Sequence, residues 1–102
     1  MKTYKIQRPP LTKTFYVPSR EDLLDLDIGY LVKLTFTDNR HNNAERMWVQ
    51  ITDMPFNYEW RGILKNKPLA LKLKYNEKIF FHPYDIINIL PPEHKGRPNK
   101  SK

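Results

Sequence analysis

Cysteine is absent from this chain, and serine and glycine are scarce. Without cysteine the protein forms neither disulfides nor thiolate metal sites, which fits a reducing compartment. The only serines are Ser19 and Ser101, so the usual nucleophilic triads lack their nucleophile. The three glycines, Gly29, Gly62 and Gly96, lie too far apart for a phosphate-binding loop. We therefore expect a protein that is not an enzyme and has no catalytic residues.

Patterns for metal binding and membrane targeting are missing as well. None of the three histidines, His41, His82 and His94, has a second histidine at the short spacing that zinc sites use. We expect no metal and no cofactor. Residues 1–10 lack the apolar segment of a secretory signal, and no apolar run approaches membrane-spanning length. The sequence predicts a cytoplasmic, soluble protein without a membrane partner.

Positive charge is what the chain has in excess. Its 102 residues are enough for one domain with one compact core, and the formal net charge is +7. Residues 1–20 contain no acid, 21–59 are mainly acidic, and 60–90 and 91–102 are basic again. Such asymmetry concerns partners rather than fold. It indicates either a polyanion-binding face or an ordinary solvated, lysine-rich surface.

Two segments, 45–52 and 30–37, show the clearest structural signal. Both alternate apolar and polar residues with a period of two, which is typical of half-buried strands. We expect the apolar face of each strand to point into the core. These inward residues are Met47, Val49 and Ile51 in segment 45–52, and Val32, Leu34 and Phe36 in segment 30–37. Trp48 then points outward, either exposed or, as we favour, covered by the N-terminal segment or a short helix.

Cap and turn residues place the other elements. Ser19 and Asp22 form a capping pair for a short helix over residues 20–26, and Gly29 supplies a positive φ after it. Gly62, inside a strand, indicates a bulge, a bend or a close backbone approach. The remaining predicted elements are strands over 58–65, 78–82 and 86–90, a 3₁₀ turn at Pro83–Asp85, and a short extended segment or part of a long connection over 69–74.

This order of elements predicts a mainly β protein. We expect a small five-stranded SH3-like barrel with a short N-terminal helix and a disordered basic C-terminal tail. An OB-like barrel is the main alternative, and an open curled sheet with the helix laid on it is the third. The barrel occupies residues 19–90, the tail 91–102. Residues 1–18 form an extension that docks in part through Phe15, Tyr16 and Val17, with its first several residues mobile.

Three sequence blocks carry a resemblance to a known family. They are ERMWVQIT at 45–52, WRGILKNKP at 60–68 and KIFF at 78–81, followed by Ile86. They resemble the uncharacterised bacterial YegJ-like domain, whose pattern runs E-R-M/F-W-V-x-V-T, G-x-L-x-N-x-P, G-D-x-V-x-F and then isoleucine. The resemblance covers residues 29–90 and implies a domain of that extent, without an activity. The family's Gly-Asp is Asn76-Glu77 here, and asparagine also tolerates a positive φ.

Basic and aromatic residues are the remaining functional candidates. Lysines and arginines that alternate with exposed rings are typical of surfaces that bind nucleic acid, because the cations meet phosphates and the rings stack on bases. For Tyr58 and Trp60, an exposed and a covered position remain equally open. The sequence predicts an accessory module that binds single-stranded nucleic acid without sequence readout. The candidate residues are Arg46, Arg61, Lys65, Lys67, Lys72, Lys74, Lys78, Tyr58 and Trp60.

A protein-interaction role is the alternative. Met54 and Phe56 flank Pro55 and would form an exposed apolar loop tip suited to a protein partner. The charge split between residues 21–59 and 60–90 also favours association between patches of opposite sign. On this hypothesis the chain is an interaction module, or a small subunit of a larger bacterial or mobile-element assembly.

Overall fold

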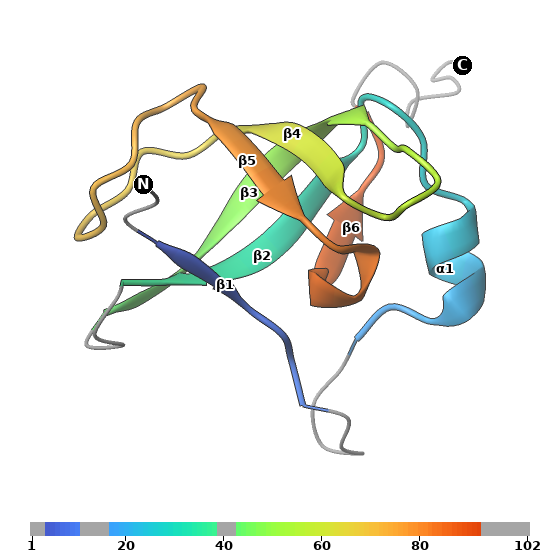
Figure 1. Ribbon diagram of the computed structural model, residues 1–102, viewed down its shortest axis with the longest axis horizontal. Coiled ribbons are helices and arrows are strands. Elements are labelled where there is room, and N and C mark those ends of the chain that lie inside the picture. Colours follow the sequence, from blue (N-terminus) through green and yellow to red (C-terminus); the bar gives the residue numbers. More distant parts are fainter. Residues whose placement is uncertain (1–3, 11–16, 39–42, 93–102) are drawn as a thin grey trace, which may run out of the picture.

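One curled antiparallel sheet with a helix at one end makes up the fold (Figure 1). The computed structural model describes residues 4–10, 17–38 and 43–92. The chain is mainly β, as its sequence predicts, but the sheet has six strands rather than five. The elements are β1 (Lys5–Gln7), α1 (Arg20–Leu24), β2 (Leu31–Thr37), β3 (Ala44–Asp53), β4 (Trp60–Leu64), β5 (Lys78–Phe81), the 3₁₀ turn η1 (Pro83–Asp85) and β6 (Asn88–Leu90).

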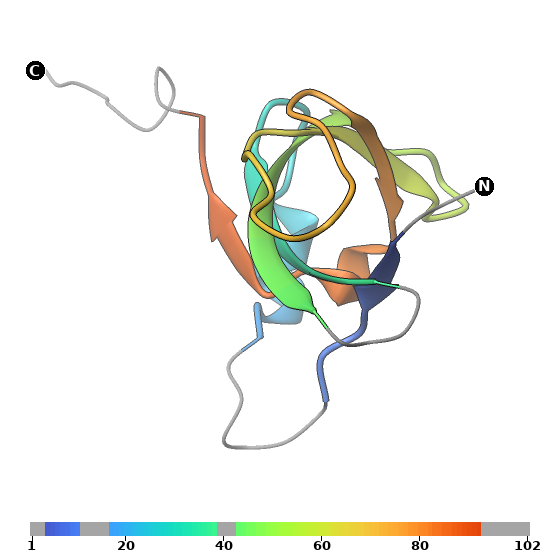
Figure 2. The ribbon, with the colours of Figure 1, turned by 90° about the vertical axis from the view of Figure 1, so that its left-hand side faces the viewer.

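The strands follow the order β1-β2-β3-β4-β5, and β6 returns to pair with β2. Two strands therefore share one edge of β2: β1 covers residues 35–37 and β6 covers residues 31–33. Figure 2 shows the sheet curling round until β1 and β5 lie close together. A hydrogen bond between the Tyr4 side chain and the backbone of Phe80 joins these two edges.

The core lies inside the curl and is built from alternate residues of the strands. The six side chains that the sequence predicts to point inward from β2 and β3 are all buried, as predicted. The same cluster also includes Ile79 and Phe81 of β5, Leu64 of β4 and Ile86, together with Tyr4, Leu26, Trp60, Leu71 and Leu73. Because every second residue on a strand faces the same side, the polar residues between them face outward.

The N-terminal segment contributes a strand where the sequence predicts mobile residues. Lys5–Gln7 pairs with β2, and Tyr4 before it is buried at 5% exposure with its ring 5.6 Å from that of Phe36. The sequence predicts docking through Phe15, Tyr16 and Val17 instead. Val17 is half-buried, whereas residues 11–16 lie outside the described residues, as does the tail 93–102.

Helix α1 begins where the capping pair predicts. Ser19 Oγ accepts from the Asp22 N–H at 3.1 Å, and the Asp22 carboxylate accepts from the Ser19 N–H at the same distance. The helix ends at Leu24, two residues early, because Leu26 turns into the core while Leu24 stays 75% exposed. Gly29 then adopts the positive φ expected of it, +96°.

Strand β4 passes very close to β3 at Gly62. A Cβ on this residue would lie 2.5 Å from Gln50 O and from Val49 Cγ1, which confirms the close approach predicted from the sequence. The pairing of the two strands also shifts register between Ile51 and Asp53. β4 begins only at Trp60, because Tyr58 adopts a positive φ of 64° in the preceding turn. The segment 69–74 is part of a long connection and contains no strand.

Candidate functional site

The connection between β4 and β5, residues 65–77, crosses one end of β3 and brings predicted basic residues together. The Asn66 side chain accepts from the backbone N–H of Trp48, and the Glu45 carboxylate accepts from the backbone N–H groups of residues 69–71. These bonds hold the connection beside the first residues of β3. We name the cations gathered here the basic face: Arg46, Lys65, Lys67, Lys72, Lys74 and Lys78.

Five of the six side chains in the basic face are exposed, and Lys65 is half-buried. Between residues 65 and 78 the only acid is Glu77, whose carboxylate accepts from the backbone N–H of Lys74 at 2.8 Å. The acids Glu21, Asp22, Asp25 and Asp27 lie instead on and after α1. Figure 1 shows this helix and the β4–β5 connection at opposite ends of the long axis. The molecule therefore has a basic and an acidic end.

Glu45 belongs to the framework of the basic face rather than to its surface charge. Partial burial works to raise the pKa of this carboxyl, but three backbone N–H groups favour the charged form. Their combined effect is larger, so the pKa lies below its ordinary value of 4.5. The carboxylate thus stays charged at neutral pH and fixes the turn that carries Lys67 and Lys72.

Two exposed rings border the basic face, and the candidate residues taken from the sequence include neither. Tyr75 is 50% exposed with Lys65 Nζ 5.4 Å from its ring centroid, and Phe80 is 41% exposed on the outward side of β5. The guanidinium of Arg61 lies 5.9 Å from the Phe80 ring. The outward position of Phe80 could have been predicted from the sequence, because Phe80 alternates with the inward residues Ile79 and Phe81.

The aromatic residues that the sequence proposes for this surface lie elsewhere. Trp60 is only 6% exposed, and its ring packs edge-on to Phe81 at 6.3 Å, so an exposed position is wrong. The reason is parity: Trp60 shares a face of β4 with Gly62, and that face points into the core. Tyr58 is 55% exposed but lies beside His82, with ring centroids 5.7 Å apart, away from the β4–β5 connection.

Arg61 stands apart from the other predicted cations. Its Nε lies 3.6 Å from the Asp53 carboxylate, and its side chain is 40% exposed. Part of its charge is therefore compensated within the chain. Trp48 is half-buried, and Lys33 Nζ lies 4.9 Å from the centroid of its ring. The N-terminal residues 11–16 lie outside the described residues, so cover of Trp48 by that segment stays a prediction.

The predicted apolar tip is reduced to one residue. Phe56 is 99% exposed, as expected, whereas Met54 is half-buried and packs against the core, so its predicted exposure is wrong. In the described part of the chain, no group of three or more metal-ligating side chains is close enough to hold a metal ion. Nor does any helix among those residues have the length and apolarity to cross a membrane.

Comparisons with protein-family models, with curated proteins and with solved structures find no match to this chain. The resemblance to the YegJ-like domain therefore stays a prediction.

Proposed function

We propose that the protein binds single-stranded nucleic acid, without sequence readout, through the basic face. The observation that carries this proposal is the concentration of exposed lysines on the β4–β5 connection, at the end opposite the acidic helix. Lysines of this kind contact phosphates, which provide affinity but no sequence information. The rings of Tyr75 and Phe80 border these lysines and would stack on bases, an interaction that tolerates any sequence.

We also infer that the curled sheet is an SH3-like barrel and that the protein is an accessory binding module rather than an enzyme. Two features support the barrel: a 3₁₀ turn precedes the last strand, and that strand returns to pair with β2. A small barrel of this type serves either nucleic-acid or protein binding, so the fold alone does not decide between them. The distribution of charge is what favours nucleic acid here.

A salt series with a fluorescent single-stranded oligonucleotide tests the proposal. For single strands, each phosphate contact makes the slope of log K against log salt more negative by about 0.7. If four or five cations of the basic face engage phosphates, the slope is about −3 by the same relation. Affinity that stays constant from low to moderate salt would refute the proposal.

Matched charge reversals locate the surface. Lys67→Glu and Lys74→Glu each remove a cation from the basic face, and both should weaken binding and flatten the salt slope. Arg20→Glu makes the same change in net charge on α1, at the opposite end, and should leave the slope unchanged. Equal effects from all three variants would show that net charge, and not the basic face, governs binding.

Stacking is tested at Tyr75. Tyr75→Ala should weaken binding by roughly 1–3 kcal/mol if one base stacks on the ring, while Tyr75→Phe should bind like the parent. Because Tyr75 is half exposed, neither change should disturb the fold. If Tyr75→Ala binds as tightly as the parent, this ring takes no part and the lysines alone carry the affinity.

A further inference from the structure

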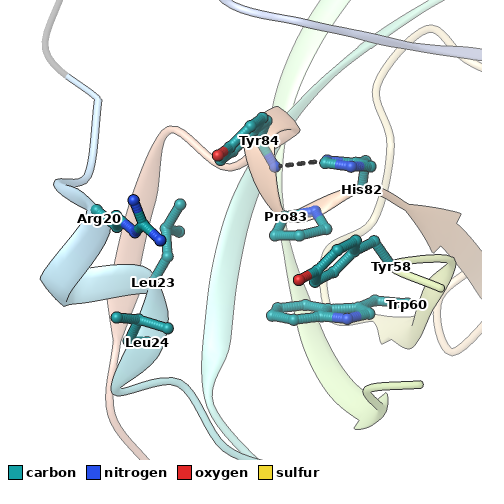
Figure 3. Close-up of a pocket in the computed structure, with 8 residues that line it drawn as sticks. All are labelled: Arg20, Leu23, Leu24, Tyr58, Trp60, His82, Pro83 and Tyr84. Atoms are coloured by element: carbon teal, nitrogen blue, oxygen red, sulfur yellow. Dashed lines mark hydrogen bonds between the residues drawn. The ribbon is translucent and has the colours of Figure 1, made fainter. Parts of the chain in front are cut away.

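At the acidic end of the molecule, two cavities join into one groove between α1 and η1. The first, of about 280 Å³, is shown in Figure 3: Leu23 and Leu24 lie on one side, and Tyr58, Trp60 and Tyr84 on the other. The second, of about 400 Å³, extends toward Arg8, Pro9 and Val17. Both cavities are lined by Arg20, Leu23, Pro83 and Tyr84, so we treat them as one feature and name it the aromatic groove.

The lining of the aromatic groove is apolar with positive edges. Tyr58 and Tyr84 are 55% and 61% exposed, so two large rings face solvent beside the groove. Among the described residues no carboxylate lines either cavity, although Glu21, Asp22, Asp25 and Asp27 lie on and after α1. The two charged groups that do line it are Arg8 and Arg20. Arg20 is exposed and takes part in none of the ion pairs found among the described residues.

Internal hydrogen bonds hold the walls in place. His82 Nδ1 accepts from the Tyr84 N–H at 3.0 Å, and the Asp85 carboxylate accepts from the His82 N–H at 3.0 Å (Figure 3 draws the first of these bonds). The other oxygen of Asp85 accepts from Arg8 Nε at 3.0 Å. A preformed wall lowers the entropic cost of binding. These bonds also occupy backbone donors of η1, so the groove offers side-chain surfaces rather than an open strand edge.

These properties select the type of ligand. A peptide that adds a strand needs a free edge, which η1 and α1 do not provide, whereas a polyproline II peptide presents a fully solvated backbone and docks between aromatic side chains. Two adjacent apolar cavities suit two apolar or proline side chains on such a peptide. Arg8 is paired with Asp85, whereas Arg20 is exposed and takes part in neither of the ion pairs found among the described residues. Arg20 therefore favours an acidic residue on the same segment.

We propose that the aromatic groove binds an extended, proline-containing peptide of a partner protein, with an acidic residue facing Arg20. This site is independent of the basic face. The chain would then hold a protein at one end and nucleic acid at the other, which gives the interaction role predicted from the sequence a different location from the Met54–Phe56 tip.

The proposal is tested by measuring binding of the full chain to an array of synthetic Pro-x-x-Pro peptides. The peptides carry acidic, neutral or basic residues at and beside the x positions. Acidic members should be retained preferentially. Tyr84→Ala should weaken their binding at least about tenfold, as expected for an aromatic anchor, while Tyr84→Phe should keep it. Arg20→Glu should weaken binding of the acidic peptides about fivefold, which is the effect on affinity expected for one exposed charge pair. The same variant should bind the basic peptides more tightly than the parent does.

Controls separate this site from the basic face. Tyr84 is exposed, so Tyr84→Ala should leave the circular dichroism spectrum and the salt slope for single-stranded oligonucleotide unchanged. Two results overturn the proposal: an array in which no acidic member is retained, or one in which basic members bind the parent better. Loss of oligonucleotide binding in Tyr84→Ala would assign the groove to nucleic acid and would overturn it as well.

Discussion

The close approach of β4 to β3 makes Gly62→Ala a sharp test of the fold. Elsewhere, exchanging glycine for alanine stabilises a protein by about 0.4–1 kcal/mol when the native backbone suits alanine, because the unfolded chain loses freedom. Gly62 does not have a positive φ, so that gain applies here. The new methyl carbon, however, would lie 2.5 Å from Gln50 O and Val49 Cγ1.

The steric term should outweigh the gain. One contact atom is a backbone carbonyl inside the β3–β4 pairing, and it cannot move without disturbing that pairing. Forcing an extra carbon into a packed site costs typically about 1–3 kcal/mol. Two contacts at 2.5 Å, one of them to backbone, place the cost at the upper end of this range, so the net loss after the alanine gain is about 2 kcal/mol. In a domain of this size, each kcal/mol lowers Tm by about 4–8 °C.

Thermal and urea unfolding followed by circular dichroism measure the loss, and a parallel series at Gly29 provides the control. At Gly29 the nearest atom to a new Cβ, Pro92 Cγ, is 3.6 Å away, so the constraint is the positive φ of +96° and not space. Asparagine should therefore be tolerated better than alanine at Gly29, and worse than alanine at Gly62. A Gly62→Ala variant as stable as the parent would refute the close approach.

Two further predictions concern the ends of the sheet. Tyr4→Phe should lower the free energy of unfolding in urea by about 1 kcal/mol, because it removes the hydroxyl bonded to the Phe80 backbone. Tyr4→Ala should cost about 3–5 kcal/mol, because it also removes the buried ring. A Tyr4→Phe variant as stable as the parent would show that the hydroxyl is unimportant. Glu45→Gln should lower stability above pH 4.5, because the folded carboxyl has a pKa below that ordinary value. The stability that Glu45 contributes is lost as pH falls through the folded pKa, so the two proteins should converge in acid. A difference that persists unchanged in acid would contradict the role given to its charge.

Local patterns in the sequence were sufficient for the central part of the fold. In β2 and β3 every second residue is apolar, so one face alone could be buried, and the structure buries it. Ser19 with Asp22, Gly29, and the turn Pro83–Asp85 each have a local cause for their conformation, and each is present as predicted. Short-range chemistry determines these features, so no knowledge of distant contacts was needed.

Features that depend on distant contacts were missed. Tyr4 and Ile6 alternate with the exposed Lys5 and Gln7, but β1 has only three residues, and an alternation this short does not distinguish a strand from an irregular segment. The burial of Trp60 depends on which face of β4 turns inward, and the sequence leaves this open because Ile63 and Leu64, on opposite faces, are both apolar. The aromatic groove combines segments near residues 8, 20, 58 and 84, and a pattern within one short window cannot bring these together.

Strand β1 also has a consequence for the edge of β2 along which it lies. β6 pairs only with residues 31–33 of β2, so without β1 the N–H and C=O groups of residues 35–37 would be open to another chain. Unpaired strand edges of this kind are templates for aggregation. The three residues of β1 thus occupy backbone groups of β2 on which a second chain could otherwise form a strand.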